Sequence, residues 1–483
     1  MTLDELLRGE DLAIGNADLV VRGLTLDSRK VEPGFVFAAL PGVKVHGRDF
    51  IPKALAAGAS AILTDAPVEA PVPVITVPEP AALLARMAAR FYPRQPEHIV
   101  AITGTNGKSS TVEFLRQIWA GAGLEAACLG TLGVTRGNTV EVTGYTTPDA
   151  VALQAALDRL AGEGVTHLGM EASSHGLKQH RMDGVRLSVG AFTNLTQDHL
   201  DYHPDFADYY ASKLKLFTER LPANGRAVIN VDSEWGGKMA ETARARGLDV
   251  LTMGWRGADL TIREITPRPA SQSVVFAWRG REHALDIPLV GEFQILNALG
   301  AAAIALADGV DEASVLATLK TLTGVRGRLE KVGETAEAAP VLVDYAHTPD
   351  GLDKLLRAAR PHTRGRVIVV FGCGGDRDAS KRAKMGVIAA NQADHVIITD
   401  DNPRSEHPAL IRKAILKGCP GAEEIADRAQ AIRRGVTMLR AGDCLLIAGK
   451  GHETGQTVGD VVHPFDDREQ GRVALAEREA ANV

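Results

Sequence analysis

The sequence predicts an α/β protein built from three domains. Near residue 104 a short apolar run enters a Gly-rich turn and then a helix, and from about residue 329 short apolar strands alternate regularly with helical stretches. The pattern of apolar runs, and with it the expected order of strands and helices, changes along the 483 residues. These changes place the expected domain boundaries at residues 1–92, 93–328 and 329–483. Each of these segments has a size that a single domain commonly has.

The first expected domain mixes short strands with helices. Residues 34–42 indicate a strand and a turn, residues 52–59 a helix, and residues 61–64 another strand. The proline-rich stretch 66–80 is typical of an edge strand and a connection, because proline cannot donate to a sheet ladder. We therefore expect a small α/β domain at the N-terminus.

The second expected domain follows a strand–helix pattern with long excursions. Residues 98–103 form an apolar run typical of a parallel strand buried on both faces, and residues 166–170 and 190–193 resemble it. Apolar and polar residues alternate over 260–287, which indicates antiparallel strands. The alanine-rich stretch 291–307 indicates a helix. A mostly parallel sheet follows from this pattern.

In the third expected domain, strands and helices alternate most regularly. Short apolar strands are indicated at residues 341–344, 367–371, 395–399 and 444–448, with helical stretches between them. This order predicts a doubly wound, Rossmann-like sheet with helices on both faces. In such sheets ligands bind beyond the carboxyl ends of the strands.

Composition excludes several classes of function. The net charge of -6 argues against a polynucleotide partner, since proteins that track phosphates are usually basic. The four cysteines form no CxxC pair, so neither a zinc knuckle nor a disulfide framework is indicated. The chain shows neither a signal peptide nor an apolar stretch of membrane-spanning length. We expect a cytoplasmic protein.

The strongest single motif is the Gly-rich turn AITGTNGKSST, residues 101–111. Glycines let backbone N–H groups approach phosphate oxygens, and the following helix N-terminus favours an anion. Lys108 would neutralise phosphate charge, and Ser109 would offer its hydroxyl to Mg²⁺. The general P-loop pattern has glycine where this chain has Ile102, and a helix-capping turn is the alternative interpretation. We expect a nucleotide phosphate site.

Acidic and histidine residues follow two more strands of this domain. Glu171 ends a strand and could hold Mg²⁺, although a surface strand end is the plainer interpretation of an isolated carboxylate. The loop at residues 198–203 carries Asp198, His199, Asp201 and His203, for which a metal or phosphate site competes with simple capping or loop hydrogen bonding.

A lysine falls on the apolar face of the next expected helix. Phe206, Tyr210, Lys213 and Phe217 share one face by helical spacing, whereas Lys215 lies on another. A lysine buried on that face should lose its proton more readily than usual, and a neutral amine can form a carbamate with carbon dioxide. A lysine that extends its amine to solvent is the alternative.

Charged residues also cluster after the strands of the third domain. Arg377 and Arg404 could each bind a carboxylate through two hydrogen bonds, and Glu453 could bind an ammonium group. A small zwitterion with an additional charge is the ligand that this combination favours.

Taken together, these stretches resemble the Mur ligases over nearly the whole chain. The sequence carries, in the family's order, TGTNGKSS, TTPD, MEASSHGL, DHLDYH, YYASK, GEFQILNALGA, GRLE, DYAHTPDGL, DNPR and GKGHE. The resemblance implies a uridine-substrate domain at residues 1–92, a P-loop ATPase-like ligase domain at 93–328 and an amino-acid-binding domain at 329–483. The implied activity is ATP-dependent ligation of meso-diaminopimelate to UDP-N-acetylmuramoyl-L-alanyl-D-glutamate in peptidoglycan precursor synthesis.

The resemblance also implies roles for individual residues. Lys108, Glu171, His199 and Lys213 would be catalytic. Mg²⁺ would be held by Ser109, Glu171, His199 and a carbamate on Lys213. ATP would be bound by Gly104, Thr105, Asn106, Gly107, Lys108, Ser109, Ser110, Asn297, Arg328 and Asp344, with His347 nearby.

The two remaining substrates have their own implied contacts. The UDP-linked dipeptide would be bound by Ser28, Thr146, Thr147, Ser173, Gln179 and Arg181. Diaminopimelate would be bound by Arg377, Asp401, Asn402, Pro403, Arg404, Gly449 and Glu453. Residues 43–47 depart from a polar stretch that some relatives carry, so uridine contacts there cannot be carried over.

Three alternatives remain open at this point. A relative that adds L-lysine, or a polyglutamate-adding ligase, would share the first half of the chain; Arg377 and Arg404 favour diaminopimelate because lysine has no second carboxylate. A nucleotide-binding regulator without activity is disfavoured by the intact set of catalytic candidates. A monomer without nucleic-acid or membrane partners is expected.

Overall fold

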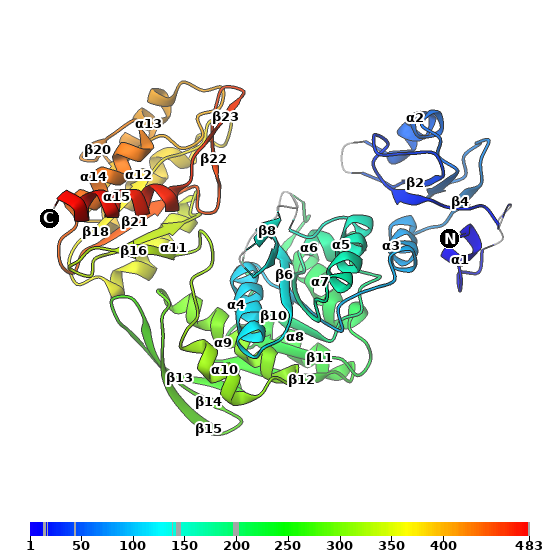
Figure 1. The fold of residues 1–483 in the computed structure, drawn as a ribbon, viewed down its shortest axis with the longest axis horizontal. Coiled ribbons are helices and arrows are strands. Elements are labelled where there is room, and N and C mark those ends of the chain that lie inside the picture. The colour runs from blue at the N-terminus through cyan, green and yellow to red at the C-terminus, as the bar shows by residue number, and fades with distance from the viewer. Residues whose placement is uncertain are drawn as a thin grey trace. The chain divides into compact units, whose positions relative to one another are not determined.

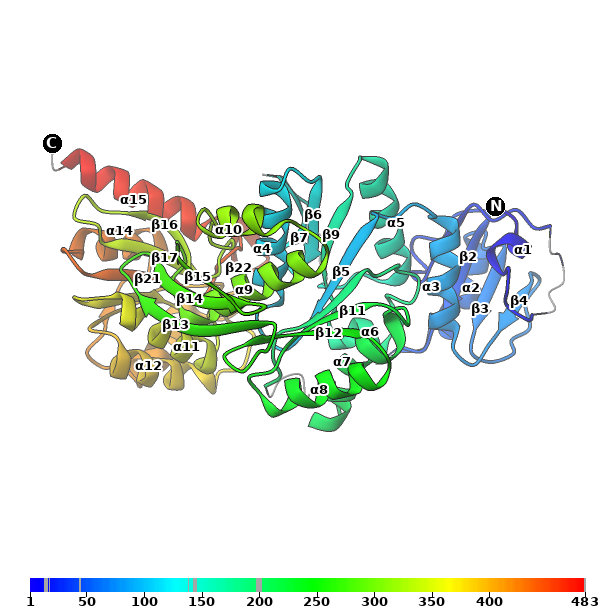
Figure 2. The ribbon, with the colours of Figure 1, turned by 90° about the horizontal axis from the view of Figure 1, so that it is seen from below.

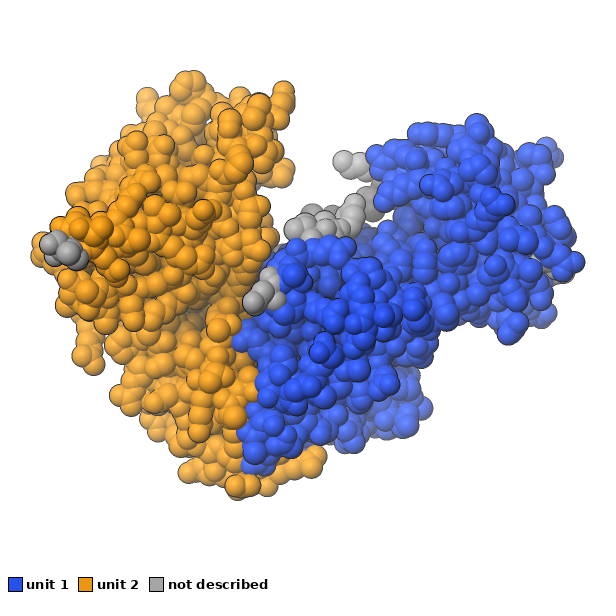
Figure 3. Space-filling model, viewed as in Figure 1, with its two compact units in different colours: residues 1–259, 300–315 blue, residues 260–299, 316–483 orange. Residues whose placement is uncertain are grey.

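The computed structural model describes residues 1–12, 16, 18–42, 45–137, 139–141, 146–196 and 202–481. The candidates Asp198, His199 and Asp201 lie outside these residues, as do Val43 and Lys44. The chain forms two compact units, residues 1–259 with 300–315 and residues 260–299 with 316–483 (Figure 3). The three domain boundaries expected from the sequence stay a prediction. Within the described ranges, no helix is both long and apolar enough to cross a membrane.

Unit 1 begins with a small parallel sheet. Its strands are β1 (Gly23–Thr25), β2 (Phe35–Ala39), β3 (Ala61–Thr64) and β4 (Val74–Thr76), hydrogen-bonded in that order. The helices around it are α1 (Leu3–Leu6), α2 (Ile51–Ala56) and α3 (Pro80–Phe91), with a 3-10 turn at Gly47–Phe50. Strand β4 is at the edge, as the prolines of residues 66–80 predict.

The larger sheet of unit 1 is mostly parallel, as predicted (Figure 1). In spatial order its strands are β12 (Asp249–Gly254), β11 (Arg226–Asn230), β10 (Val189–Phe192), β5 (His98–Thr103), β9 (His167–Glu171), β6 (Ala126–Gly130), β7 (Gly133–Arg136) and β8 (Thr139–Glu141). The six strands from β12 to β6 are parallel, and β7 and β8 are antiparallel. Burial of both faces explains the apolar strand sequences.

Helices follow most strands of this sheet. They are α4 (Lys108–Gly121), α5 (Ala150–Gly162), α6 (Ser174–Lys178), α7 (Phe206–Lys215) with a π-helical turn at Leu216–Arg220, and α8 (Glu234–Ala245). Helices α9 (Glu292–Ala307) and α10 (Glu312–Leu319) each contribute residues to both units. Helix α4 packs on β6 and β9, which places the Gly-rich turn before it at the carboxyl ends of the central strands.

Unit 2 contains an antiparallel meander and a doubly wound sheet. The meander is β13 (Leu260–Pro267), β14 (Gln272–Trp278) and β15 (Arg281–Ile287), which confirms the prediction for residues 260–287. In spatial order the sheet is β16 (Glu330–Glu334), β17 (Pro340–Asp344), β21 (Cys444–Ala448), β18 (Val367–Phe371), β19 (His395–Ile398) and β20 (Glu423–Glu424). Only β16 is antiparallel among these described strands.

Both faces of this sheet are covered by helices, as the sequence predicts. Figure 2 shows β16, β17 and β21 between α14 (Arg428–Met438) and α15 (Asp467–Ala481) on one side and α11 (Pro349–Ala359) and α12 (Lys381–Gln392) on the other. Along β18, Val367, Val369 and Phe371 pack with α11, α12 and α13 (Pro408–Leu416), and Ile368 and Val370 pack with α14 and α15. This alternation is the two-residue period of a strand buried on both faces. A hairpin, β22 (Gly455–Val458) and β23 (Val461–Pro464), follows β21.

Candidate functional site

The Gly-rich turn in unit 1 has the backbone conformation that its glycines permit. Gly104 and Gly107 adopt φ angles of 146° and 86°, and Gly107 is the N-cap of α4. A Cβ on Gly104 would lie 2.0 Å from the Thr193 hydroxyl oxygen, so only glycine fits there. Asn194 accepts a hydrogen bond from the Asn106 N–H through its side-chain oxygen at 2.9 Å. The chain after β10 therefore braces the turn at the helix N-terminus, where an anion is favoured.

Two lysine amines converge on one carbonyl oxygen of this turn. Lys108 Nζ donates to Gly104 O at 2.9 Å and to Thr105 O at 2.8 Å. Lys213 Nζ, from α7, donates to the same Gly104 O at 2.7 Å and lies 4.4 Å from the centre of the Tyr209 ring. Lys213 is 1% exposed, as the sequence predicts for its helical face. The structure thus brings both lysines to the turn.

The buried face of α7 differs in detail from the prediction. The helix buries Tyr209, Ser212 and Lys213, while Phe206 and Tyr210 are half-buried and pack against Trp235. The apolar stripe is therefore centred about one residue away from the expected one, because Trp235 on α8 covers the flank that the pattern assigned to the core. Tyr209 had no role in the sequence analysis, yet its hydroxyl lies 3.1 Å from Thr105 Oγ1.

Glu171 lies at the end of β9, beside the Gly-rich turn. Its Oε1 accepts hydrogen bonds from Ser109 Oγ at 2.8 Å and from the Thr131 N–H at 2.8 Å. The residue is 1% exposed. A Cβ on Gly130 would lie only 2.1 Å from Glu171 Oε1, so β6 must end in glycine here. A hydroxyl and a buried carboxylate held together are oxygen ligands of the kind that Mg²⁺ prefers, so Ser109 and Glu171 fit this ion.

The residues expected to hold the UDP-linked substrate form a hydrogen-bonded group next to Glu171. Thr147 Oγ1 donates to Glu171 O at 2.8 Å and lies 3.0 Å from Ser173 Oγ. Arg181 donates to Thr147 O and to Gln179 Oε1, both at 2.6 Å. Thr146 joins the group through Thr131, with 3.0 Å between their hydroxyl oxygens. Ser28, the remaining member, lies after β1 beside the small sheet.

His203, the last of the four acidic and histidine candidates at residues 198–203, is buried and makes two side-chain contacts. It is 1% exposed, its Nδ1 lies 2.6 Å from Asp208 Oδ2, and its Nε2 lies 3.0 Å from Ser174 Oγ. The sequence left two interpretations open for this histidine, a metal or phosphate site and loop hydrogen bonding. The contacts to Asp208 and Ser174 agree with loop hydrogen bonding.

In unit 2 the expected ATP residues are linked by hydrogen bonds. Asn297 Nδ2 donates to Gln294 Oε1 at 3.2 Å, and Gln294 Nε2 donates to Arg328 O at 2.9 Å. Asp344 accepts from the Leu329 and Ala346 N–H groups at 2.8 and 2.7 Å. Burial raises the pKa of Asp344, and the nearby Arg328 opposes that rise. Asp344 is the last residue of β17, at the edge of the sheet where the sequence predicts ligands.

A cavity of about 460 Å³ opens at the carboxyl ends of the unit 2 strands. Its volume suits a small molecule. Six of the seven residues expected to bind diaminopimelate line it, together with further charged groups, including Lys381 and Lys384, which the sequence analysis missed. The lining residues are Tyr345, His347, Thr348, Pro349, Gly374, Arg377, Asp378, Ser380, Lys381, Lys384, Asp401, Asn402, Arg404, Gly449 and Glu453.

Buried polar contacts fix the lining of this cavity. Asn402 donates to Glu453 Oε2 at 2.9 Å, and the fully buried Lys450 donates to Asn402 Oδ1 at 2.9 Å. Arg404 adopts a positive φ of 50° and donates from Nη1 to Gly375 O at 2.8 Å. Pro403 is buried below it. A Cβ on Gly449 would lie 2.6 Å from Asp401 Oδ2, so that position requires glycine.

Comparison with known protein families gives matches along most of the chain. The model of the Mur ligase middle domain matches residues 102–305, that of the Mur ligase glutamate ligase domain matches residues 327–451, and that of the Mur ligase family catalytic domain matches residues 20–92. The chain belongs to the Mur ligase family. The three-part Mur ligase architecture expected from the sequence is therefore confirmed.

Individual Mur ligases match nearly the whole chain. It is 51% identical to the UDP-N-acetylmuramoyl-L-alanyl-D-glutamate--2,6-diaminopimelate ligase of Bradyrhizobium diazoefficiens over 99% of this chain and 100% of that protein. It is 49% identical to the enzyme of the same name from Agrobacterium fabrum, over 100% and 97%. A solved structure of a ligase of this name matches with a TM-score of 0.76 and 32% identity over 99% of both chains. MurF from Acinetobacter baumannii has the same fold, with a TM-score of 0.63 at 19% identity.

Proposed function

We propose that this Mur ligase adds meso-2,6-diaminopimelate to the D-glutamate of UDP-N-acetylmuramoyl-L-alanyl-D-glutamate, with cleavage of ATP to ADP and phosphate. The relatives that share about half of its residues over their full length carry this activity in their names. The observation in the molecule that carries the proposal is the Gly-rich turn beside the buried Ser109–Glu171 pair. The product is a precursor of peptidoglycan.

The proposed chemistry has two steps. An oxygen of the D-glutamyl γ-carboxylate attacks the ATP γ-phosphorus, the bond to ADP breaks, and an acyl phosphate forms. The amine of diaminopimelate then attacks the acyl carbon, loses a proton, and inorganic phosphate leaves with the former C–O electron pair. Lys108 and the N–H groups of the turn bind the charged phosphate oxygens in the first step.

A magnesium ion fits the oxygen ligands of unit 1. Ser109 and Glu171 would hold it, with His199 and a carbamate on Lys213 as the further ligands that we propose. When bound, this ion supplies positive charge that stabilises the phosphoryl oxygens. Ser109 and Glu171 are already oriented toward each other, and the Thr131 N–H keeps the carboxylate in place.

The environment of Lys213 supports the carbamate. Lys213 and Lys108 direct two amines at the single Gly104 oxygen. Two positive charges so close repel each other, whereas an anionic carbamate on Lys213 would attract Lys108. Formation joins the amine nitrogen to carbon dioxide and releases one proton. The nearly complete burial of Lys213 protects such a group from bulk water.

The unit 2 cavity supports the choice of amino acid. Diaminopimelate carries two ammonium and two carboxylate groups, and the lining supplies both signs, with Arg377, Lys384 and Arg404 against Asp401 and Glu453. Arg404 is the candidate for the distal carboxylate, because a guanidinium can meet a carboxylate with two parallel hydrogen bonds. L-Lysine lacks that carboxylate and cannot form these two hydrogen bonds with the arginine. We also propose that the enzyme acts as a monomer in the cytoplasm.

A phosphate-release assay tests this proposal. With the UDP-linked dipeptide and ATP, we expect turnover with meso-diaminopimelate and little with L-lysine or D-glutamate. Arg404→Ala should raise the KM for diaminopimelate and narrow its advantage over lysine, since an unpaired, partly buried charge costs on the order of 2–5 kcal/mol, or roughly 30- to several-thousand-fold. Arg357→Ala, which removes an exposed arginine of α11, is the matched control.

The possible outcomes separate the substrate from the reaction class. Equal use of lysine by the natural protein, or full selectivity in Arg404→Ala, would refute the assignment of diaminopimelate. Lys108→Ala should lose ATP turnover while it retains binding of the UDP-linked substrate. Normal turnover in Lys108→Ala would contradict the role of the Gly-rich turn.

A further inference from the structure

A second group of metal-ligating side chains lies at the opposite edge of the central sheet. His98 and His167 are the first residues of the neighbouring strands β5 and β9, and they are paired in register. Asp308 follows the end of α9. The carboxyl ends of β5 and β9 carry the Gly-rich turn and Glu171, so this group belongs to the amino ends of the same strands. The ligase chemistry does not use it.

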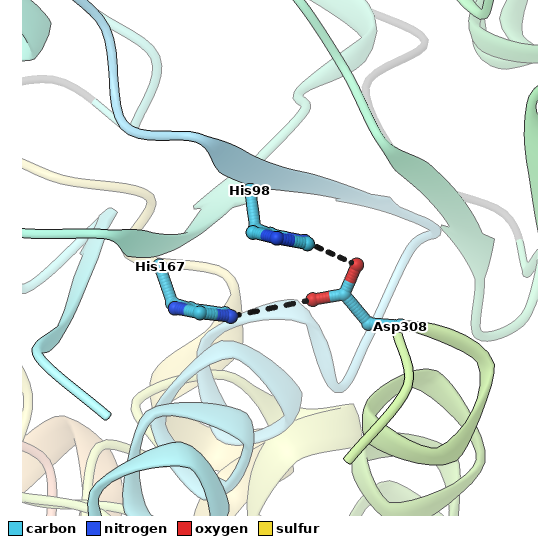
Figure 4. Close-up of side chains that lie close together, drawn as sticks. All are labelled: His98, His167 and Asp308. Atoms are coloured by element: carbon cyan, nitrogen blue, oxygen red, sulfur yellow. Dashed lines mark hydrogen bonds and ion pairs between the residues drawn. The ribbon is translucent and has the colours of Figure 1, made fainter. Parts of the chain in front are cut away.

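The three side chains point toward one another. Figure 4 shows the two imidazole rings side by side with their edges directed at the Asp308 carboxylate. The rings are 4.4 Å apart and inclined by only 3°. His98 Nδ1 lies 3.0 Å from Asp308 Oδ1, and His167 Nε2 lies 4.0 Å from Asp308 Oδ2. One ligand atom from each residue falls within 4.8 Å of the others.

Hydrogen bonds behind His167 favour a proton on its Nδ1. Thr166 Oγ1 donates its only proton to Glu125 O at 3.2 Å, so it accepts from His167 Nδ1 at 2.8 Å. The lone pair of the neutral ring is therefore on Nε2, which faces Asp308. A backing hydrogen bond of this kind is typical of histidines that bind metals.

The Asp308 carboxylate oxygen that faces His167 also lacks a hydrogen-bond donor among the described residues. The Asp308 side chain is only 4% exposed, and among the described residues none donates a hydrogen bond to its Oδ2. Two electron-pair donors thus face each other across 4.0 Å in a buried place. Such an arrangement costs free energy unless a cation lies between the two.

We infer that His98, His167 and Asp308 form a binding site for a divalent transition-metal ion of the zinc class. Two imidazole nitrogens and one carboxylate are ligands that Zn²⁺ accepts, whereas Mg²⁺ and Ca²⁺ prefer oxygen alone. Ligand atoms around four-coordinate zinc lie about 3.3 Å apart, because each bond is roughly 2.0–2.1 Å long. One ligand atom from each residue lies within 4.8 Å of the others, so side-chain movements that shorten these separations complete the site.

The ion would join three separate elements. It would connect the starts of β5 and β9 to the end of α9, and the 39% exposure of His98 gives solvent a route to the fourth coordination position. A ligand that binds only the folded state stabilises that state. The expected role is therefore structural, at a distance from the phosphate-binding turn.

Metal binding to the full-length protein tests this inference. After treatment with a chelator, the protein is dialysed against limiting ZnCl2 in excess MgCl2, and bound zinc is measured by elemental analysis. We expect one zinc ion more in the natural protein than in Asp308→Asn, and an affinity at least about tenfold weaker in the variant. Co²⁺ in place of Zn²⁺ should give visible absorption bands that Asp308→Asn lacks.

Two further variants keep the result interpretable. Thr166→Val retains all three ligands and removes the hydroxyl that contacts His167 Nδ1 and Glu125 O, so the affinity should fall about 10–100-fold. His395→Gln removes a half-buried histidine that pairs with Glu423 elsewhere, and it should bind zinc normally. If Asp308→Asn does not fold, the partly exposed His98→Gln replaces it. Equal zinc binding by the natural protein and the ligand variants would overturn the inference, as would no bound zinc in the natural protein.

Discussion

Lys213 is a charged residue in a place where charge is costly. Its side chain is 1% exposed, and its amine contacts the Gly104 oxygen and the face of the Tyr209 ring. Taking an ammonium group out of water is unfavourable unless strong partners replace the water. A protein that needed only an apolar contact here would have leucine or methionine. We therefore propose that this lysine takes part in the chemistry at the Gly-rich turn.

The first prediction concerns this residue. Lys213→Ala should lower kcat by about 10²–10³-fold, because it removes the proposed carbamate ligand of Mg²⁺. Short carboxylic acids should restore part of the activity by occupying the vacated space. After incubation with ¹³C-bicarbonate, NMR should show a carbamate carbon in the natural protein and none in Lys213→Ala.

The matched control is two residues away on the same helix. Lys215→Ala removes a half-buried lysine that lies 3.7 Å from Glu219 at the surface, and it should retain activity and the NMR signal. Full activity in a protein whose Lys213 carries no ¹³C label would exclude the carbamate. The other proposed ligands, Ser109 and Glu171, would then have to act without it.

At the scale of elements, the ends of β9 and β6 together position Glu171. Strand β6 ends at Gly130, and the missing side chain leaves room for the Glu171 carboxylate beside the following Thr131 N–H. The strand order β5-β9-β6 thus creates the carboxylate site as much as Glu171 itself does.

The second prediction tests this packing. In Gly130→Ala the new Cβ would lie 2.1 Å from Glu171 Oε1, so the carboxylate must move away from Ser109 and Thr131. A displacement of about 1 Å in a catalytic group commonly costs about 10²-fold in rate. We expect such a loss of turnover, a weaker response to Mg²⁺, and a stability cost of about 1–3 kcal/mol. Kinetics over a range of MgCl2 and urea unfolding measure these effects.

A glycine in open space provides the comparison. Gly237 lies within α8, and a Cβ there would meet no heavy atom within 4 Å. Gly237→Ala should keep full activity and stabilise the helix by up to about 1 kcal/mol. If Gly130→Ala turned over substrate as fast as Gly237→Ala does, the position of Glu171 would not matter for catalysis.

Elements with strong local signals could be predicted from the sequence, and contacts that depend on strand order could not. The strand at 98–103, the turn after it and the helix from Lys108 follow from apolar runs and glycine spacing. The burial of Lys213 follows from helical spacing. Thr131 and Lys450 were missed because their partners, Glu171 and Asn402, come from elements whose neighbours only the folded sheet defines.

The group at the amino ends of the strands was missed for the same reason. His98 and His167 are far apart in the sequence, and only the pairing of β5 with β9 makes them neighbours. Asp308 joins them because α9 ends beside these strands, which no local pattern records. Spacing motifs detect metal sites within one element, and this site combines three elements.

At the scale of the whole molecule, buried histidines and paired carboxylates should respond to acid in different pH ranges. In unit 2, burial and then Arg328, Arg326 and Arg468 lower the pKa of His452 to about 4, and burial lowers the pKa of His362. In unit 1, hydrogen bonding to Arg86 holds the pKa of Glu10 at about 2. The stability that buried neutral histidines contribute to the folded protein is lost in a different pH range from the stability that paired carboxylates contribute.

The direction in which folding stability changes with pH follows from the number of protons bound by the folded and unfolded chains. Between about pH 6.5 and 4 the unfolded chain holds a proton on His452 that the folded chain does not hold, so stability falls as pH falls through this range. Glu10 contributes stability that is present above about pH 4.5 and is lost as pH falls toward 2. The histidines of unit 2 should therefore respond to acid before the Glu10–Arg86 pair of unit 1.

The third prediction is that mild acid destabilises unit 2, and that His452 causes part of this effect. One extra proton bound by the unfolded chain gives a slope approaching about 1.4 kcal/mol per pH unit. Urea unfolding at pH 7.0, 6.0 and 5.0, with hydrogen exchange to locate the opening, should show that protection around β17 and β21 falls as the pH falls. His452→Gln should reduce the pH dependence, and His463→Gln, on the exposed strand β23, should not. Because the neutral amide of glutamine has no proton to gain, an unchanged slope in His452→Gln would mean that the buried histidine is not the group that senses acid.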